Sequence, residues 1–285
     1  MNLKTISEQM MYSTVRLTSS NGSTGTGFFF NFKFDGRYIP VIITNKHVIN
    51  DNPTEKVTFL LHTKSVENIK SFLYTKSVET ISKEKLQITF DTNWFFHKSQ
   101  DLCFCFAKPL FQQIKNQTNK EVFYISVGEE YICDIGKLEQ LSAVEDVIMV
   151  GYPNGLWDRK NNLPLFRKGI TASHPAIDFN RKNIGAVDMA CFPGSSGSPI
   201  FILNENRYAS NNGNSYSGAK RLVFLGVLFQ GPQFKAKGEL VVENIAAKQK
   251  ISSQTLIMMN LGFYIKAIEI LKFKEEVKKH YKFKI

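Results

Sequence analysis

A serine surrounded by small residues stands near the middle of the chain, in the segment Phe192-Pro-Gly-Ser-Ser-Gly-Ser-Pro199. Acyl transfer needs such a segment, because a tight turn lets a hydroxyl and nearby backbone N–H groups converge on one carbonyl. Pro193, Gly194 and Gly197 would shape that turn. By itself the segment is weak evidence, since clusters of Gly, Ser and Pro are typical of ordinary turns.

A serine nucleophile needs an adjacent base, and the base needs a group that orients it. His47 follows the apolar run Val41-Ile-Ile-Thr44, which comes after Gly25-Thr-Gly-Phe-Phe-Phe30. Asp101 opens the apolar run Asp101-Leu-Cys-Phe-Cys-Phe106. Each residue alone is better explained by a structural role at the end of a strand.

Taken together in chain order, His47, Asp101 and Ser196 make the sequence resemble the trypsin-like (chymotrypsin-fold) serine peptidases. Thr44-Asn-Lys-His-Val48 stands where that family carries Thr-Ala-Ala-His-Cys. Gly194-Ser-Ser-Gly-Ser-Pro199 stands where its secreted members carry Gly-Asp-Ser-Gly-Gly-Pro. The resemblance implies an all-β fold of two packed six-stranded antiparallel β-barrels with a C-terminal α-helix.

Further matches extend the resemblance over residues 12–282. Val150-Gly-Tyr-Pro-Asn-Gly-Leu156 and Lys168-Gly-Ile-Thr-Ala-Ser173 resemble the opening strands of the second barrel in bacterial members, including HtrA-like protease domains. Leu225-Gly-Val-Leu-Phe-Gln-Gly231 and Leu261-Gly-Phe-Tyr-Ile-Lys-Ala267 resemble the strands that wall the specificity pocket. We therefore expect a bacterial intracellular peptidase of this type, without the PDZ module.

The resemblance assigns a role to each residue of the motifs. Ser196 would be the nucleophile, His47 the general base and then acid, and Asp101 the orienting carboxylate. The N–H groups of Gly194 and Ser196 would form the oxyanion hole. Ser195 remains the alternative nucleophile.

The resemblance also locates a substrate pocket. Its base would be Ala190, six residues before the nucleophile, and its walls would include Gly231 and Gly262. These residues offer volume without charge, which predicts an uncharged, medium-to-large side chain before the cleaved bond. The alternative is that Asp188 reaches the pocket and favours a basic side chain. The substrate backbone would lie extended along Phe229–Gly231 as an added strand.

The sequence departs from the secreted family at Ser195, where those members carry an aspartate that binds a newly cut N-terminus. Without a carboxylate there, activation by N-terminal cleavage loses its physical basis. We expect regulation by an effector, a partner or substrate access.

Short β-branched and aromatic runs bounded by Gly, Pro, Asn and Asp predict an all-β body. A helical stripe within Tyr264–Tyr281 predicts a terminal helix. The expected organisation is an N-terminal barrel over 1–125, a C-terminal barrel over 126–263 and the helix over 264–285. The predicted strands are Thr14–Leu17, Gly27–Phe34, Tyr38–Thr44, Val57–His62, Leu86–Phe90, Leu102–Phe106, Val147–Val150, Gly169–Ser173, Pro199–Leu203 and Leu222–Phe229.

Two segments have the composition of insertions. The polar segment Asn204–Lys220 is rich in Asn, Ser and Gly, which predicts a surface loop between strands. Thr63-Lys-Ser-Val-Glu67 recurs as Thr75-Lys-Ser-Val-Glu79, which predicts a duplicated hairpin or extended loop.

Charge and hydropathy exclude several other classes of protein. The net charge is +11, from 36 Lys and Arg against 25 Asp and Glu, but no Arg-rich segment favours nucleic-acid binding. The lysine-rich run 272–284 is best explained as a solvated helix face. The longest apolar run, Leu222–Phe229, is too short to span a membrane, and the N-terminus lacks the apolar region of a signal peptide. We expect a cytoplasmic protein without membrane contact.

The remaining cysteines and histidines have plain structural interpretations. Four cysteines are too few for a disulfide framework in a chain of this length. Cys103 and Cys105 would share one side of a strand as packing thiols, and no ligand spacing predicts a metal or cofactor. Cys133 and Cys191 are predicted to be inert. The histidines predicted to lie on the surface are His62, His97, His174 and His280.

The favoured function is a serine endopeptidase that forms an acyl-enzyme. Its substrate would be a polypeptide, and we expect one dedicated protein in stress or anti-phage defence. A catalytically silent trypsin-like protein-binding module and a basic nucleic-acid-binding protein are the alternatives.

Overall fold

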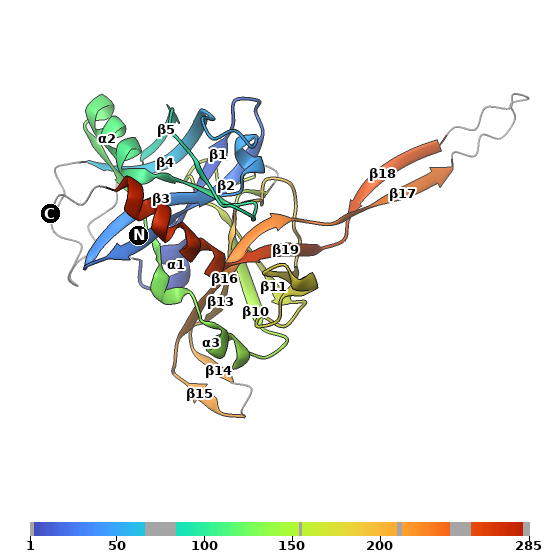
Figure 1. The fold of residues 1–285 in the computed structure, drawn as a ribbon. Coiled ribbons are helices and arrows are strands. Elements are labelled where there is room, and N and C mark those ends of the chain that lie inside the picture. Colours follow the sequence, from blue (N-terminus) through green and yellow to red (C-terminus); the bar gives the residue numbers. More distant parts are fainter. Residues whose placement is uncertain (1–2, 66–83, 154–155, 210–212, 240–251, 282–285) are drawn as a thin grey trace, which may run out of the picture.

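The computed structural model describes residues 3–65, 84–153, 156–209, 213–239 and 252–281, and strands dominate it (Figure 1). Each strand predicted from the sequence has a counterpart, and the fold is chymotrypsin-like. The repeated segment at 63–79 lies largely outside the described residues. No helix in the described ranges is long and apolar enough to cross a membrane.

The described N-terminal strands form one nine-stranded sheet rather than the closed six-stranded barrel that we expected. Its main path runs β5-β4-β1-β2-β3-β7-β6, with β8 beside β4 and β9 beside β2. The strands are β1 (Thr14–Thr18), β2 (Thr24–Phe34), β3 (Arg37–Thr44), β4 (Val57–Ser65), β5 (Glu84–Phe90), β6 (Phe95–Phe96), β7 (Cys103–Phe106), β8 (Lys120–Phe123) and β9 (Val127–Gly128). Among the described strands, this path ends at β5 on one side and at the two-residue strand β6 on the other.

The C-terminal strands form the closed barrel that the sequence predicts, in the order β10-β11-β12-β19-β16-β13. Neighbours pair antiparallel around the ring, for example Val187 with Gly262 and Pro199 with Val227. The strands are β10 (Asp146–Gly151), β11 (Leu165–Thr171), β12 (Ile184–Asp188), β13 (Pro199–Asn204), β16 (Arg221–Gln230) and β19 (Leu261–Lys266). A β-bulge between Leu228 and Gln230 bends β16 where it leaves the barrel.

Helical segments pack against both groups of strands. The sequence analysis missed α2 (Ala107–Thr118), although Ala107, Leu110 and Ile114 are all buried and follow a helical spacing. The predicted terminal helix is a 3₁₀ segment, η6 (Ala267–Phe273), followed by α4 (Lys274–His280). The other short helical elements are α1 (Ile6–Met10), η1 (His47–Ile49), η3 (Glu129–Tyr131), α3 (Ile135–Glu139) and η5 (Phe179–Arg181).

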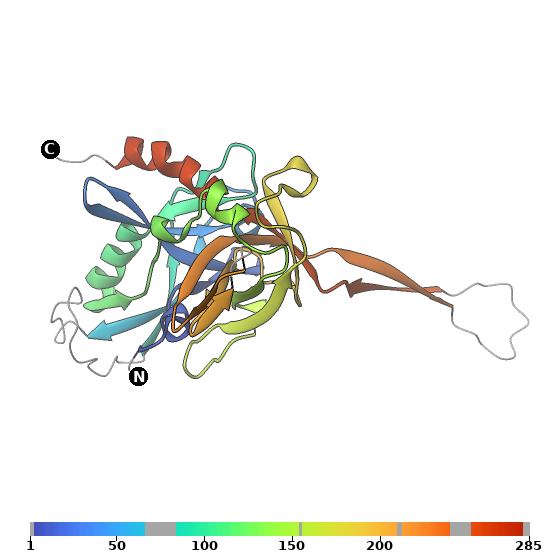
Figure 2. The ribbon, with the colours of Figure 1, turned by 90° about the horizontal axis from the view of Figure 1, so that it is seen from below.

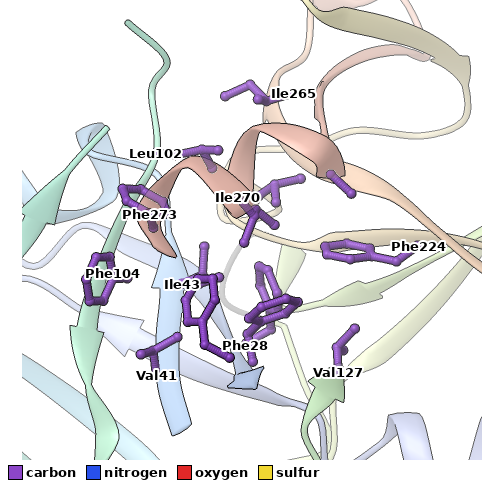
Figure 3. Packing of buried hydrophobic residues seen from close by; sticks show 14 of the residues in the cluster. Phe28, Val41, Ile43, Leu102, Phe104, Val127, Phe224, Ile265, Ile270 and Phe273 are labelled. Carbon is purple, nitrogen blue, oxygen red and sulfur yellow. The ribbon is translucent and has the colours of Figure 1, made fainter. Parts of the chain in front are cut away.

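One hydrophobic cluster joins the two halves. Figure 3 shows Ile270 and Phe273 of the terminal segment between Phe104 of the N-terminal sheet and Phe224 of the barrel. The rings of Phe104 and Phe273 meet edge to face at 4.9 Å, and Phe28 and Phe224 do so at 5.5 Å. Because these side chains come from both halves, burying them fixes one half against the other.

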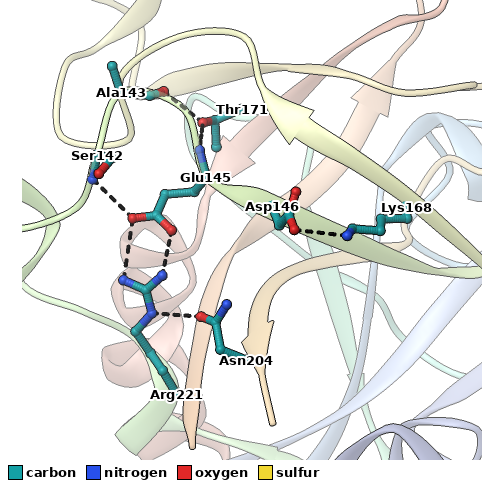
Figure 4. Close-up of polar contacts among 8 residues, drawn as sticks. All are labelled: Ser142, Ala143, Glu145, Asp146, Lys168, Thr171, Asn204 and Arg221. Atoms are coloured by element: carbon teal, nitrogen blue, oxygen red, sulfur yellow. Dashed lines mark hydrogen bonds and ion pairs between the residues drawn. The ribbon is translucent and has the colours of Figure 1, made fainter. Parts of the chain in front are cut away.

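A buried ion pair ties the barrel to the segment that leads into it (Figure 4). Arg221 pairs with Glu145, and both side chains are largely buried. Arg221 Nε also donates to Asn204 Oδ1 at 2.8 Å, and Ser142 N donates to Glu145 Oε1 at 3.0 Å. A buried ion pair is tolerated when its polar atoms are satisfied in this way. The contacts fix the approach to β10.

Two hairpins extend beyond the barrel. The hairpin of β14 (Arg207–Ala209) and β15 (Ser215–Ser217) lies in the polar segment 204–220, which we had predicted as a surface loop. The second hairpin, β17 (Gln233–Glu239) with β18 (Ser252–Met258), was not anticipated. Figures 1 and 2 show this second hairpin standing out from the body, between β16 and β19.

Candidate active site

His47 and Asp101 meet because their strands are neighbours. β3 pairs antiparallel with β7, and Thr44 lies opposite Cys103. The end of β3 and the start of β7 are therefore at one edge of the sheet, where His47 and Asp101 follow and precede them. His47 Nδ1 lies 2.6 Å from Asp101 Oδ2. This is the geometry in which a carboxylate fixes the imidazole tautomer and leaves Nε2 to act as a base.

Backbone contacts hold Asp101 in its ionised form. Its Oδ1 accepts hydrogen bonds from the N–H groups of Lys46 at 2.8 Å and His47 at 3.3 Å. Burial opposes ionisation, but the hydrogen bonds and charge of His47, with the backbone of Lys46, keep the pKa of Asp101 below its usual value. Asn45, fully buried, donates from Nδ2 to the Asp101 carbonyl at 2.7 Å. The orienting carboxylate is thus positioned from three neighbouring residues.

The loop of Ser196 turns sharply because two glycines adopt positive φ. Gly194 has φ 84° and Gly197 has φ 85°. A Cβ at Gly197 would also collide with the carbonyl oxygen of Thr26, so only glycine fits there. Thr26 N donates to the Ser196 carbonyl at 2.9 Å, and Thr26 Oγ1 donates to the Gly194 carbonyl at 3.1 Å. Strand β2 of the N-terminal sheet therefore holds the serine loop of the C-terminal barrel.

The three serines of this loop differ in exposure. Ser195 and Ser198 are fully buried, and neither hydroxyl has a hydrogen-bond partner among the described residues. Ser196, between them, is partly exposed. Its hydroxyl makes no hydrogen bond to a described residue, His47 included. Such catalytic contacts are often long without substrate and tighten when it binds.

The backbone N–H groups around Ser196 differ in whether a described residue accepts from them. The N–H of Ser195 donates to the Phe192 carbonyl at 3.0 Å, and that of Gly197 donates to the Leu228 carbonyl at 2.8 Å. Among the described residues, nothing accepts from the N–H groups of Gly194 and Ser196. Two such donors, within two residues of a partly exposed serine, can stabilise the oxyanion of a tetrahedral intermediate.

Comparisons with known proteins show the family of the chain. A family model described as the trypsin-like peptidase domain matches residues 25–208. The chain belongs to the trypsin-like peptidase family. A comparison with curated proteins finds no match. Among solved structures, a crystal structure of the scabies mite inactivated protease paralogue S-I1 is 11% identical, with 95% of this chain and 97% of that chain covered at a TM-score of 0.42.

The expected substrate pocket of this peptidase-family chain is partly filled by Cys191. Gly262 leaves no open volume, because a Cβ there would collide with Cys191 Sγ and lie 2.8 Å from Leu228 Cδ1. A Cβ at Gly231 would lie 3.2 Å from Cys191 Cβ. Cys191 therefore occupies the space directly beside both glycines, and the size of the side chain that the pocket accepts stays a prediction. Burial raises the pKa of Cys191 to about 12, so the thiol stays neutral.

The other predicted pocket residues lie around the serine loop. Ala190 is half-buried in the segment after β12, and Phe229 is half-buried on β16. Asp188 is exposed. It lies on the opposite face of β12 from Val187, whose side chain packs toward Gly262, because successive strand residues alternate. This placement argues against a basic pocket formed by Asp188.

Two histidines that we expected on the surface are buried. His62 lies in β4, and its Nε2 donates to the Asn162 carbonyl at 2.8 Å. His97 accepts from Gln100 N at 2.9 Å, and its Nε2 lies 3.4 Å from Oε2 of buried Glu269. Burial lowers the pKa of His97, although Glu269 partly offsets this. His174 is half-buried and His280 is exposed.

Sequence reasoning missed the contacts of Thr26 with the serine loop and the buried pair of His97 and Glu269. Thr26 stood within the quoted Gly-Thr-Gly motif, so a signal for it existed. Glu269 is distant in sequence from His97 and carried no signal. Cys103 and Cys105 are buried packing thiols as predicted, and burial raises the pKa of both. No group of three or more His, Cys, Asp or Glu side chains suited to a metal ion occurs in the described part of the chain.

Proposed function

We propose that this member of the trypsin-like peptidase family is a serine endopeptidase with Ser196, His47 and Asp101 as its catalytic residues. One observation carries the proposal. Ser196 carries the only partly exposed hydroxyl in residues 192–199, and the backbone N–H groups of Gly194 and Ser196 have no acceptor among the described residues. A silent binding module would have no need for this combination.

In the proposed reaction, Ser196 Oγ attacks the peptide carbonyl carbon while His47 Nε2 takes its proton. Asp101 Oδ2 stabilises the imidazolium through Nδ1, and the N–H groups of Gly194 and Ser196 donate to the carbonyl oxygen as it becomes negative. The C–N bond then breaks as His47 returns the proton to the leaving amine. Water repeats the sequence on the ester bond, which releases the acid and restores Ser196.

The pocket supports an uncharged side chain before the cleaved bond. Ala190, Gly231 and Gly262 carry no charge, and Cys191 is held neutral by burial. An unpaired Lys or Arg in such a site would cost several kcal/mol, on the order of 2–5. We further propose one dedicated protein substrate in the cytoplasm, in stress or anti-phage defence, whose identity a proteome-wide map of cleavage sites would give.

Covalent labelling with a fluorophosphonate tests the proposal. Wild type should be labelled once, and Ser196→Ala should lose both labelling and peptide cleavage while its thermal unfolding stays unchanged. Ser195→Ala is the matched control, because it removes a neighbouring hydroxyl that is buried, and it should keep most of the activity. Labelling that persists in Ser196→Ala would assign the nucleophile elsewhere, and an unlabelled wild type would favour the silent binding module.

A further inference from the structure

The hairpin of β17 and β18, which we call the arm, leaves two strand edges open. Its strands pair only with each other among the described strands, from Gln233 opposite Met258 to Glu239 opposite Ser252. Figures 1 and 2 show it standing clear of both halves of the body. An isolated two-stranded hairpin is marginal in water, and an open edge is a template for another strand.

The arm continues the two strands that flank the predicted pocket. β16 ends at Gln230 and β17 begins at Gln233, while β18 ends at Met258 and β19 begins at Leu261. Met259 N donates to the Pro232 carbonyl at 3.3 Å across the junction. The hydrogen-bonded ladder therefore runs from the barrel into the arm.

This junction also fixes which backbone groups face the open edge of β17. Pro232 turns its carbonyl toward Met259, so Gly231 and Gln233, on either side, turn theirs to the opposite edge. In an antiparallel pair, hydrogen-bonded and non-hydrogen-bonded positions alternate. The residues that present N–H and C=O groups to the open edge are accordingly Gln233, Lys235, Lys237 and Glu239.

We infer that the arm binds the part of a polypeptide substrate that precedes the cleaved bond, as a strand added to the open edge of β17. The inference rests on the proposed function. Gly197 N donates to the Leu228 carbonyl, which places Phe229 beside the serine loop. A substrate strand would run antiparallel to Phe229–Gly231. The residues before its cleaved bond would then extend past Gly231 and along β17.

The arm predicts a preference for length rather than for sequence. β17 has seven residues, which at about 3.3 Å each extend the track by roughly 23 Å. Backbone hydrogen bonds are available to any extended chain, whereas a folded surface cannot enter such a track. The substrate class is therefore an extended or unfolded polypeptide with a long segment before the cut.

The test uses a mixture of peptides from a digested proteome, with cut sites identified by mass spectrometry. Three variants are compared with wild type: an arm deletion that replaces residues 233–258 with a short Gly-Ser turn, Lys237→Pro and Lys237→Ala. Proline at position 237 removes the N–H that faces the open edge of β17, without removing a hydrogen bond to β18. Alanine at the same position removes the lysine charge but keeps the N–H, so it is the control.

Wild type should cut peptides with about ten residues before the bond roughly tenfold faster than peptides with about four. The arm deletion should cut long and short peptides at equal rates. Lys237→Pro should lower the ratio of the two rates, and Lys237→Ala should leave it unchanged. All three variants should retain fluorophosphonate labelling, which shows that the active site is intact. If the arm deletion loses labelling, the length preference of Lys237→Pro tests the inference instead. An unchanged ratio of rates in the arm deletion or in Lys237→Pro overturns the inference about the arm and leaves the proposed peptidase function unaffected. Absence of both labelling and cleavage in wild type overturns the proposed function and this inference with it.

Discussion

At the scale of single residues, the site depends on the protonation states that its neighbours impose. Asp101 accepts from two backbone N–H groups and from His47, which keeps its pKa low and its charge in place. His47 is thereby fixed with Nδ1 toward Asp101 and Nε2 free. Burial keeps Ser195 and Ser198 away from substrate, so exposure distinguishes Ser196 from identical neighbours.

Replacement of Asp101 by Asn tests this assignment of the tautomer. The amide keeps the shape of the carboxylate but can donate to Nδ1, so the proton of His47 moves to Nε2 and the base is lost. We expect kcat to fall by about 10⁴-fold with little change in KM or in thermal unfolding. Steady-state kinetics on a cleaved peptide measure this, and a loss below about tenfold would mean that another carboxylate orients His47.

At the scale of elements, strand β2 reaches across to the serine loop. The hydroxyl of Thr26 accepts from Tyr152 N at 3.1 Å and donates to the Gly194 carbonyl at 3.1 Å. Thr44 Oγ1 in turn donates to the Thr26 carbonyl at 2.7 Å. The Gly194 carbonyl lies in the peptide group after Gly194, and its free N–H lies in the group before it. The contact therefore holds the residue that carries one of the two free N–H groups.

Substitution of Thr26 by Val should impair the oxyanion donors more than the fold. Valine keeps the shape but leaves the Tyr152 N–H and the Gly194 carbonyl without partners, at about 1–3 kcal/mol of unfolding free energy. We expect kcat to fall about tenfold or more while KM changes little. Urea unfolding and steady-state kinetics measure the two effects.

Two further variants make the Thr26 result decisive. Thr26→Ser restores the hydroxyl and should recover most of kcat. Thr58→Val removes an exposed hydroxyl that pairs with Thr89 Oγ1 at 2.9 Å, and it should change neither quantity. Equal losses of kcat in Thr26→Val and Thr26→Ser would show that the hydroxyl does not position Gly194.

At the scale of the whole molecule, the two halves are joined by shared apolar packing and by a few buried polar contacts. Phe28, Phe104, Phe224 and Phe273 belong to one cluster drawn from both halves. His62 adds a polar contact, because its Nε2–H donates to the carbonyl of Asn162 in the opposite half. Both contacts must break when the halves separate.

The contact of His62 predicts that acid weakens the association. Burial lowers the pKa of His62 to about 4, partly offset by its bond to Asn162, whereas the unfolded chain has a pKa of about 6.5. Between pH 6.5 and about 4, His62 binds a proton in the unfolded state but not in the folded state. The free energy of unfolding therefore decreases as the pH is lowered through this range. The loss is about 3 kcal/mol over this window.

Urea unfolding at several pH values between 7 and 4 measures this loss. His62→Gln should lower stability at pH 7 and flatten the decline toward pH 4, because the titrating group is gone. Exposed His280 provides the control, and His280→Gln should leave the decline unchanged. An equally steep decline in His62→Gln would assign the acid sensitivity to another group.

The sequence by itself determined the fold family, ten of the strands and the three candidate catalytic residues His47, Asp101 and Ser196 in order. Covalent catalysis requires particular residue types at strand ends and turns. Strands show alternating hydrophobicity over a few consecutive residues. The candidate residues and the strands can therefore both be recognised from short stretches of sequence. The tertiary structure alone decided that Cys191 fills the space beside Gly262 and that His97 pairs with Glu269. It alone decided that the described N-terminal strands form one nine-stranded sheet. It alone showed that the chain after Gly231 forms an arm. These features depend on contacts between distant segments, and burial depends on what packs against a side chain, which no local pattern records.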